Sequence, residues 1–220
     1  MMHSSRFQPG RSSNNSAYLR RVFVRRVHQL VLLGYNRLTP PLYVRAEEPE
    51  ITGDLVEAIG AVLSERREPW MTVFSVHDDA PVNDGRRKGK RRKRVDLRID
   101  SGAFRPSARF QFESKRLGKR HPVRISLGVE GLGRFLRGEY AKEEYQAGMI
   151  GYVQSGNLDD WGNRIAREFA TTPALYGVDP ATPFSLRAKP SAGSRAYHSR
   201  HHRTTVGRPI LIDHILLTFY

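Results

Sequence analysis

Apolar and polar residues alternate in two neighbouring segments near the middle of the chain. Residues 95–100 read VDLRID and residues 110–115 read FQFESK, so every second position is apolar over most of each segment. A period of two predicts strands that bury one face in a sheet. The turn formers Gly102, Pro106 and Ser107 lie between them. The pattern therefore predicts a β-hairpin.

The same alternation indicates which side chains share a face of this hairpin. A slip of one residue would turn every side chain of a strand to the opposite face, so the apolar positions fix the register. The polar face then collects Asp96, Glu113 and Lys115 at neighbouring positions. Two carboxylates can bind a hard divalent cation, and a nearby ammonium can act on a water or a phosphate.

Periodicity along the rest of the chain predicts one domain over 17–220, after a polar tail at 1–16 that we expect to be disordered. Its expected core is 47–154. The expected elements, in chain order, are a helix over 17–38 that ends near Gly34, a helix over 49–66, a strand over 70–76, a basic loop over 83–94, the hairpin, a short helix over 128–138, a strand over 148–154, a helix over 158–170, an irregular connection over 171–208 and a strand over 209–220.

The net charge of the chain limits the kinds of molecule that we expect it to bind. The 220 residues include 37 Lys and Arg against 22 Asp and Glu, a formal net charge of +15. Such an excess favours a polyanion, with nucleic acid as the first candidate; a solubilising charge and binding to an anionic membrane surface are the alternatives. The sequence has no cysteine, no apolar run after a basic start at its N-terminus and no apolar run of spanning length, so we do not expect secretion. We expect a cytoplasmic protein that does not enter membranes.

An Asp in one strand followed by Glu-x-Lys in the next resembles the PD-(D/E)XK nuclease superfamily. Here the matching residues are Asp96 and the triplet Glu113-Ser114-Lys115, while Val95 stands in place of the proline in the family's name. The resemblance covers 47–154. It implies an α/β (α+β) fold with a restriction-endonuclease-like core, in which helices flank a central mixed sheet in the order α-β-β-β-α-β.

The resemblance also implies the chemistry. Asp96, Glu113 and Lys115 would be catalytic, and Asp96 and Glu113 would hold Mg²⁺ or Mn²⁺ together with a glutamate from the preceding helix. Glu50 is the best match for that glutamate; Glu47 and Glu57 remain alternatives, and so does a simple role of such acids at a helix N-terminus. The implied activity is endonucleolytic hydrolysis of phosphodiester bonds in restriction, repair or phage defence, with DNA favoured over RNA. A homodimer is compatible with a double-strand cutter.

The rival hypothesis is a non-catalytic nucleic-acid-binding protein in which Glu113 and Lys115 form a cross-strand ion pair. Both hypotheses use the basic residues around the hairpin as phosphate contacts, although the densest run also resembles a nuclear-localisation signal. The expected nucleic-acid-binding residues are Arg86, Arg87, Lys88, Lys90, Arg91, Arg92, Lys93, Arg94, Arg116, Lys119, Arg120 and Arg134.

Histidines and acids elsewhere carry weaker signals. His77, with the two aspartates after it, is expected in a turn rather than in a metal site. His198 and His202 have the spacing of a zinc-binding helix, but no partner acid or cysteine lies at a suitable distance in the sequence, so we expect a basic loop that includes His201. Asp213 and His214 interrupt an apolar strand and are expected to form a satisfied polar pair in or beside the core.

Overall fold

The computed structural model describes residues 10–82, 89–104 and 107–220. A single mixed sheet of seven strands in the order β1-β2-β3-β4-β7-β6-β5 runs through the molecule. The central pairs β3/β4 and β4/β7 are parallel, and the outer pairs are antiparallel. The strands are β1 (Phe74–Pro81), β2 (Arg94–Ser101), β3 (Ala108–Leu117), β4 (Gln146–Val153), β5 (Ser185–Ser191), β6 (Ser194–His201) and β7 (Ile210–Thr218).

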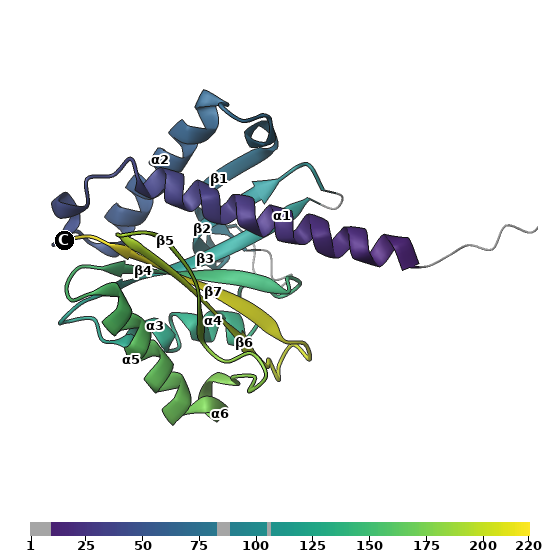
Figure 1. Cartoon of the computed structure of the whole chain (residues 1–220). Helices are drawn as coiled ribbons and strands as arrows, with labels where there is room; N and C mark the ends of the chain where they lie inside the picture. The colour runs from purple at the N-terminus through teal and green to yellow at the C-terminus, as the bar shows by residue number, and fades with distance from the viewer. Residues whose placement is uncertain (1–9, 83–88, 105–106) are drawn as a thin grey trace, which may run out of the picture.

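Helices cover both faces of the sheet (Figure 1). One face carries α1 and α2, and the other carries α3 to α6. The α-helices are α1 (Gly10–Tyr35), α2 (Glu48–Glu65), α3 (Val123–Leu127), α4 (Leu132–Leu136), α5 (Leu158–Thr171) and α6 (Pro173–Tyr176). Short 3-10 turns lie at Pro40–Tyr43, Pro69–Val73 and Gly89–Arg91. The expected α/β (α+β) class, a mixed sheet flanked by helices, is confirmed at this level.

Each face of the sheet has its own apolar core. On the α1 face, Val27 and Leu30 of α1 and Leu55 of α2 are fully buried against side chains of the strands. On the opposite face, Trp161 and Ile165 of α5 are buried at helical spacing. Because both faces are covered, strands β4 and β7 are apolar at most positions, without the alternation of a half-buried strand.

The predicted hairpin is confirmed as β2 and β3. Leu97 lies opposite Phe112, and this register leaves Asp96 and Glu113 on the same face of the sheet. On the other side of β3, Phe112 lies beside Gly148 of β4. A side chain at position 148 would place its Cβ 2.2 Å from the Phe112 ring, so glycine is required where these strands meet.

Three expectations before residue 82 were wrong in whole or in part. Helix α1 already begins at Gly10, within the segment expected to be disordered. The apolar stretch after Pro69 begins as a 3-10 turn, and the strand follows at Phe74. Strand β1 therefore includes the His77 segment that was expected to be a turn, and Asp79 has a left-handed φ of 41° within it.

The connection expected to be irregular over 171–208 instead holds α6, β5 and β6. The expected basic loop of histidines is therefore largely a strand: His198 and His201 belong to β6, and His201 is fully buried. The final strand is confirmed as β7, where Asp213 and His214 are buried and hydrogen-bonded, although to different partners, His28 and Ser199, and not as a pair. Within the described ranges, no helix is long and apolar enough to cross a membrane.

Candidate functional site

The candidate site forms where β2 separates from β3. Paired residues end at Leu97 and Phe112, and beyond them carboxylates occupy the place of the neighbouring strand. The backbone N–H of Ser114 donates to Asp96 Oδ2 at 2.6 Å, and the N–H of Arg116 donates to Glu48 Oε2 at 3.3 Å. Because β2 and β3 diverge here, acidic side chains take the place of a paired strand and accept from the backbone N–H groups of β3.

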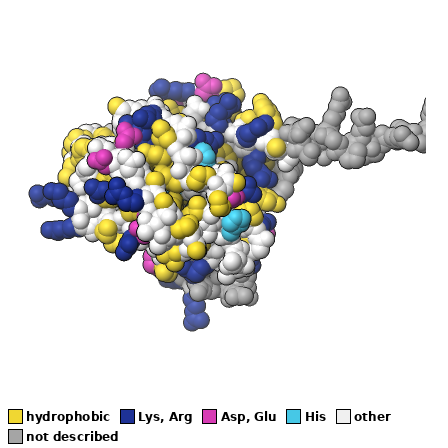
Figure 2. All heavy atoms as spheres, turned by 60° about the horizontal axis from the view of Figure 1, so that its bottom comes forward, with side chains coloured by type: hydrophobic (Ala, Val, Ile, Leu, Met, Phe, Trp, Pro, Cys, Tyr) yellow, Lys and Arg dark blue, Asp and Glu magenta, His cyan; other side chains and the backbone are white. Residues whose placement is uncertain are grey.

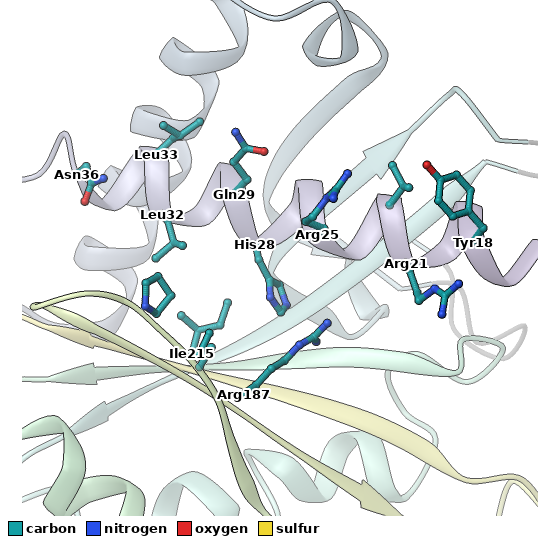
Figure 3. Close-up of a pocket in the computed structure, with 14 residues that line it drawn as sticks. Tyr18, Arg21, Arg25, His28, Gln29, Leu32, Leu33, Asn36, Arg187 and Ile215 are labelled. Carbon is teal, nitrogen blue, oxygen red and sulfur yellow. The ribbon is translucent and has the colours of Figure 1, made fainter.

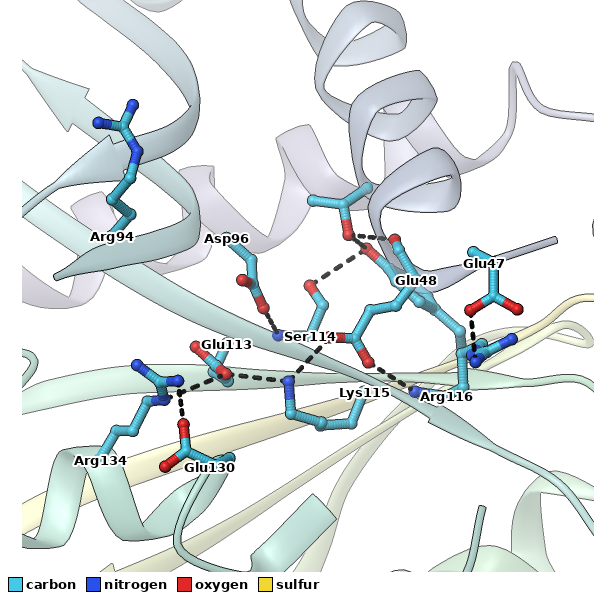
Figure 4. A network of polar contacts seen from close by, with 12 residues as sticks. Glu47, Glu48, Arg94, Asp96, Glu113, Ser114, Lys115, Arg116, Glu130 and Arg134 are labelled. Carbon is cyan, nitrogen blue, oxygen red and sulfur yellow. Dashed lines mark hydrogen bonds and ion pairs between the residues drawn. The ribbon is translucent and has the colours of Figure 1, made fainter. Parts of the chain in front are cut away.

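Lys115 connects two of the carboxylates. Its Nζ lies 2.9 Å from Glu113 Oε1 and 2.8 Å from Glu48 Oε1 (Figure 4). The side chain of Glu113 is only 3% exposed and that of Lys115 only 12%. Asp96, Glu113 and Lys115, which the alternation placed on one face, therefore do lie together in the structure.

Arg134 closes the cluster from helix α4. Its Nε lies 3.7 Å from Glu113 Oε1, and it also forms an ion pair with Glu130. Its Nη1 donates to the hydroxyl of Tyr140 at 2.7 Å. The sequence assigned Arg134 to phosphate binding in general, whereas the structure places it directly beside the carboxylates (Figure 4).

Burial dominates the electrostatics of these groups. It raises the pKa of Glu113 to about 8, with a further contribution from the charge of Asp96, and this outweighs the opposing effects of Lys115 and Arg134. The pKa of Asp96 is also raised by burial. For Lys115 burial lowers the pKa, but the charges of Glu113 and Glu48 prevail and raise it, so the side chain stays an ammonium.

The helix carboxylate beside Lys115 is Glu48, and the expectation of Glu50 was wrong. Both lie in the first turn of α2, but Glu50 is exposed. Glu47 stands at the N-cap position without a capping hydrogen bond from its side chain, which pairs with Arg116 at 2.6 Å, and Glu57 is exposed. Glu48 is the first residue of the helix, so its side chain reaches past the end of α2 to the strand.

The basic residues expected to bind nucleic acid fall into three groups. Arg86, Arg87 and Lys88 lie outside the described residues. Several of the others already have acidic partners: Lys93 with Glu139, Arg94 with Asp79 and Arg116 with Glu47. Arg94 extends away from the carboxylate cluster (Figure 4). Lys90, Arg91, Lys119 and Arg120 are exposed to solvent, as is the paired Arg94, whereas Arg92 is half-buried.

Charge is unevenly distributed over the surface. Figure 2 shows a face on which Lys and Arg side chains outnumber Asp and Glu and gather along the rim. On the α3 and α5 side, a groove of about 410 Å³ includes Lys119, Arg124, Arg164 and Arg167 in its lining. A positive surface of this kind attracts anions, and a polyanionic partner stays a prediction.

The carboxylates can be compared with the needs of a metal ion. Glu113 Oε2 is buried and has no hydrogen-bond partner among the residues that the structure describes, which is a costly state that a cation would relieve. Across 10–82, 89–104 and 107–220, no three His, Cys, Asp or Glu side chains are grouped so that they could hold a metal ion. Mg²⁺ commonly keeps several waters and takes one or two carboxylates together with substrate phosphates, and Asp96 and Glu113 fit that smaller set.

No family model, no curated protein and no solved structure matches this chain.

Proposed function

We propose that this protein is a metal-dependent nuclease that hydrolyses phosphodiester bonds of nucleic acid, with DNA as the favoured substrate. Asp96 and Glu113 would hold Mg²⁺ or Mn²⁺, and Lys115 would act beside them. In this proposal α2, strands β1 to β4 and the helices between β3 and β4 form a restriction-endonuclease-like core, whose elements follow one another in the order helix, three strands, helix, strand.

The observation that carries the proposal is the buried, unpartnered Oε2 of Glu113. It belongs to a cluster of three carboxyl groups, from Glu48, Asp96 and Glu113, and two cationic groups, from Lys115 and Arg134. A divalent cation at Glu113 would replace the proton that its raised pKa otherwise retains at neutral pH, and the basic surface nearby would attract the polyanion on which that cation acts.

In this mechanism each residue of the cluster would have a separate role. A divalent cation at Asp96 and Glu113 would lower the pKa of a bound water and stabilise charge on the phosphate. Because Lys115 stays an ammonium, it would orient the attacking water and donate hydrogen bonds to the scissile phosphate rather than act as a base. Arg134 would stabilise negative charge that develops on the phosphate oxygens. Glu48 would position the ammonium of Lys115.

The test is cleavage of plasmid DNA, single-stranded DNA and RNA with Mg²⁺ or Mn²⁺, comparing the wild type with Glu113→Ala at matched purity. We expect metal-dependent cleavage that the substitution abolishes, and the cut substrate identifies the nucleic acid. Absence of cleavage of all three substrates by the wild type, or equal cleavage by both proteins, would refute the nuclease proposal.

One observation favours a second function, a non-catalytic nucleic-acid-binding protein. Lys115 pairs with two carboxyl groups, and Asp96 and Glu48 accept hydrogen bonds from backbone N–H groups of β3. The same contacts would stabilise the fold where two strands separate, without any catalytic role. Mn²⁺ affinity separates the two functions. Asp96→Asn should weaken Mn²⁺ binding if the cluster is a metal site and leave it unchanged if the cluster is structural.

A further inference from the structure

A second cavity lies between α1 and the strands at the β5 end of the sheet. Its volume is about 680 Å³, within the range typical of small-molecule sites. It faces α1, because Asp213 beside it bonds to His28 of that helix. Glu113 lies beside Met149, whose side chain belongs to the core on the opposite face. The cavity is therefore separate from the carboxylate cluster.

One end of the cavity is apolar. Leu32 and Leu33 of α1 line it together with Pro190, Ala196 and Ile215 from the strands (Figure 3). The two leucines are partly buried and pack against the core of this face. An aliphatic chain placed here would be removed from water, which is favourable in proportion to the apolar area buried.

The other end of the cavity is cationic. Tyr18, Arg21 and Arg25 line it from α1, and Arg187 lines it from β5 (Figure 3). Arg21 and Arg25 make no hydrogen bond, ion pair or ring contact within the part of the chain that the structure describes. Two arginines, one helical turn apart and without acidic partners, form a place that favours an anion.

A buried carboxylate holds two further groups in place between these ends. Asp213 is fully buried; it accepts from Arg187 Nη1 at 3.0 Å and from Gln146 Nε2 at 2.6 Å, and it lies 3.0 Å from His28 Nε2. Asp213 thereby fixes Arg187 and His28 at the cavity wall. Its own charge is neutralised within this network, so Arg21 and Arg25 keep their excess of positive charge.

We propose that this cavity binds an amphipathic anion with a single aliphatic chain and a carboxylate or phosphate head group. The head group would bind at Arg21 and Arg25, and the chain would extend along α1 towards Leu32 and Leu33. Arg21 and Leu32 are roughly 16 Å apart along the axis at about 1.5 Å per residue, so the ligand must be elongated. This binding does not depend on the nuclease proposal.

The test is calorimetric titration of the full chain with three twelve-carbon probes below their micelle concentrations: dodecanoate, dodecyl phosphate and dodecyltrimethylammonium. We expect the anions to bind with one-to-one stoichiometry and to raise the melting temperature, and the cation to bind at least tenfold more weakly. The tighter of the two anions identifies the head group. Anions that bind no better than the cation would overturn the proposal.

Two variants make the test specific. Arg21→Gln/Arg25→Gln should weaken dodecanoate binding at least tenfold, whereas Arg164→Gln/Arg167→Gln, with the same loss of charge from exposed positions on α5, should not. Ala196→Leu, which adds volume to the cavity wall, should weaken both anions. Unchanged binding in the Arg21/Arg25 variant would overturn the proposal. A second outcome would also overturn it: a wild-type dimer that binds no anion and that the Arg21/Arg25 variant dissociates. The cavity would then be a contact surface for a second copy of the chain.

Discussion

Lys115 Nζ lies 2.8 Å from Glu48 Oε1, although 67 positions separate the two residues in the chain. The contact joins the first residue of α2 to a residue near the end of β3 and places a third carboxyl group at the cluster of Asp96 and Glu113. In the proposed mechanism the supporting role therefore falls to Glu48 rather than to Glu50.

The two glutamates provide a matched pair for testing this assignment. Glu48→Gln should reduce cleavage about tenfold or more, because Lys115 loses a charge-assisted partner that positions it. Glu50→Gln, two residues away in the same helical turn but exposed, should leave cleavage within about twofold of the wild type. Steady-state rates on one DNA substrate measure both. A larger loss in the Glu50 variant would assign the supporting role to Glu50 instead.

Lys115→Met should separate the rate of cleavage from binding. The variant keeps the aliphatic stem but loses the ammonium, so single-turnover cleavage should fall by about 10² to 10⁴ while the dissociation constant for DNA changes little. Lys119→Met is the control, because Lys119 is exposed beyond the end of β3 and should affect binding more than rate. Cleavage by Lys115→Met at the wild-type rate would count strongly against the proposed mechanism.

The basic residues before β2 should differ in their contribution to binding. Lys90 and Arg91 are exposed, whereas Lys93 is paired with Glu139. Lys90→Gln/Arg91→Gln should reduce the slope of log K against log salt for duplex DNA by up to about 2, since each lost phosphate contact removes about 0.9. Lys93→Gln should change the slope less. Fluorescence anisotropy over a range of salt concentrations measures both, and equal slopes in all three proteins would argue against phosphate contacts at Lys90 and Arg91.

Acid should destabilise the fold through two buried histidines. Burial lowers the pKa of His201 to about 4 and that of His214 to about 3, from 6.5. The unfolded chain therefore binds more protons below pH 6.5, and the free energy of unfolding should fall as the pH drops from about 6.5 towards 4. For His214 alone the loss is on the order of a few kcal/mol.

His214→Phe should flatten this dependence, because a ring of similar shape replaces a titrating one between Phe169 and Phe184. The exposed His202→Gln serves as the control. Urea unfolding at a series of pH values gives the slope. The same slope in His214→Phe and in the wild type would show that His214 does not account for the loss of stability in acid.

Local pattern was enough to predict the hairpin, its polar face, the amphipathic α5 and the final strand. In each case apolar residues recur every two or every 3.6 positions, because one face of the strand or helix is buried in the core. The alternation alone was therefore sufficient to group Asp96, Glu113 and Lys115 on one face. It could not identify Glu48, because that choice depends on where α2 begins and on its distance from β3.

Other elements could not be predicted from the sequence, because their residues show no apolar periodicity that matches the structure they form. Strand β5 reads SLRAKPS, is largely exposed and pairs with β6 through register shifts, so it lacks the alternation of a half-buried strand. The apolar segment after Pro69 contains residues typical of strands, but its first turn is a 3-10 helix with proline at its start. Arg134 was grouped with general phosphate contacts because its approach to Glu113 depends on tertiary packing of α4.

In the proposed mechanism Asp96 and Glu113 hold the cation for phosphodiester cleavage. The most direct measurement is the rate of DNA cleavage as a function of Mn²⁺ concentration for Asp96→Asn, with Asp100→Asn as the control. Asparagine at 96 can still accept from the Ser114 N–H, and Asp100 lies on the same strand but pairs with Arg98. We predict that Asp96→Asn loses cleavage by at least about a hundredfold and needs more Mn²⁺, while Asp100→Asn behaves like the wild type. Equal rates and equal Mn²⁺ dependence in Asp96→Asn and the wild type would contradict the account.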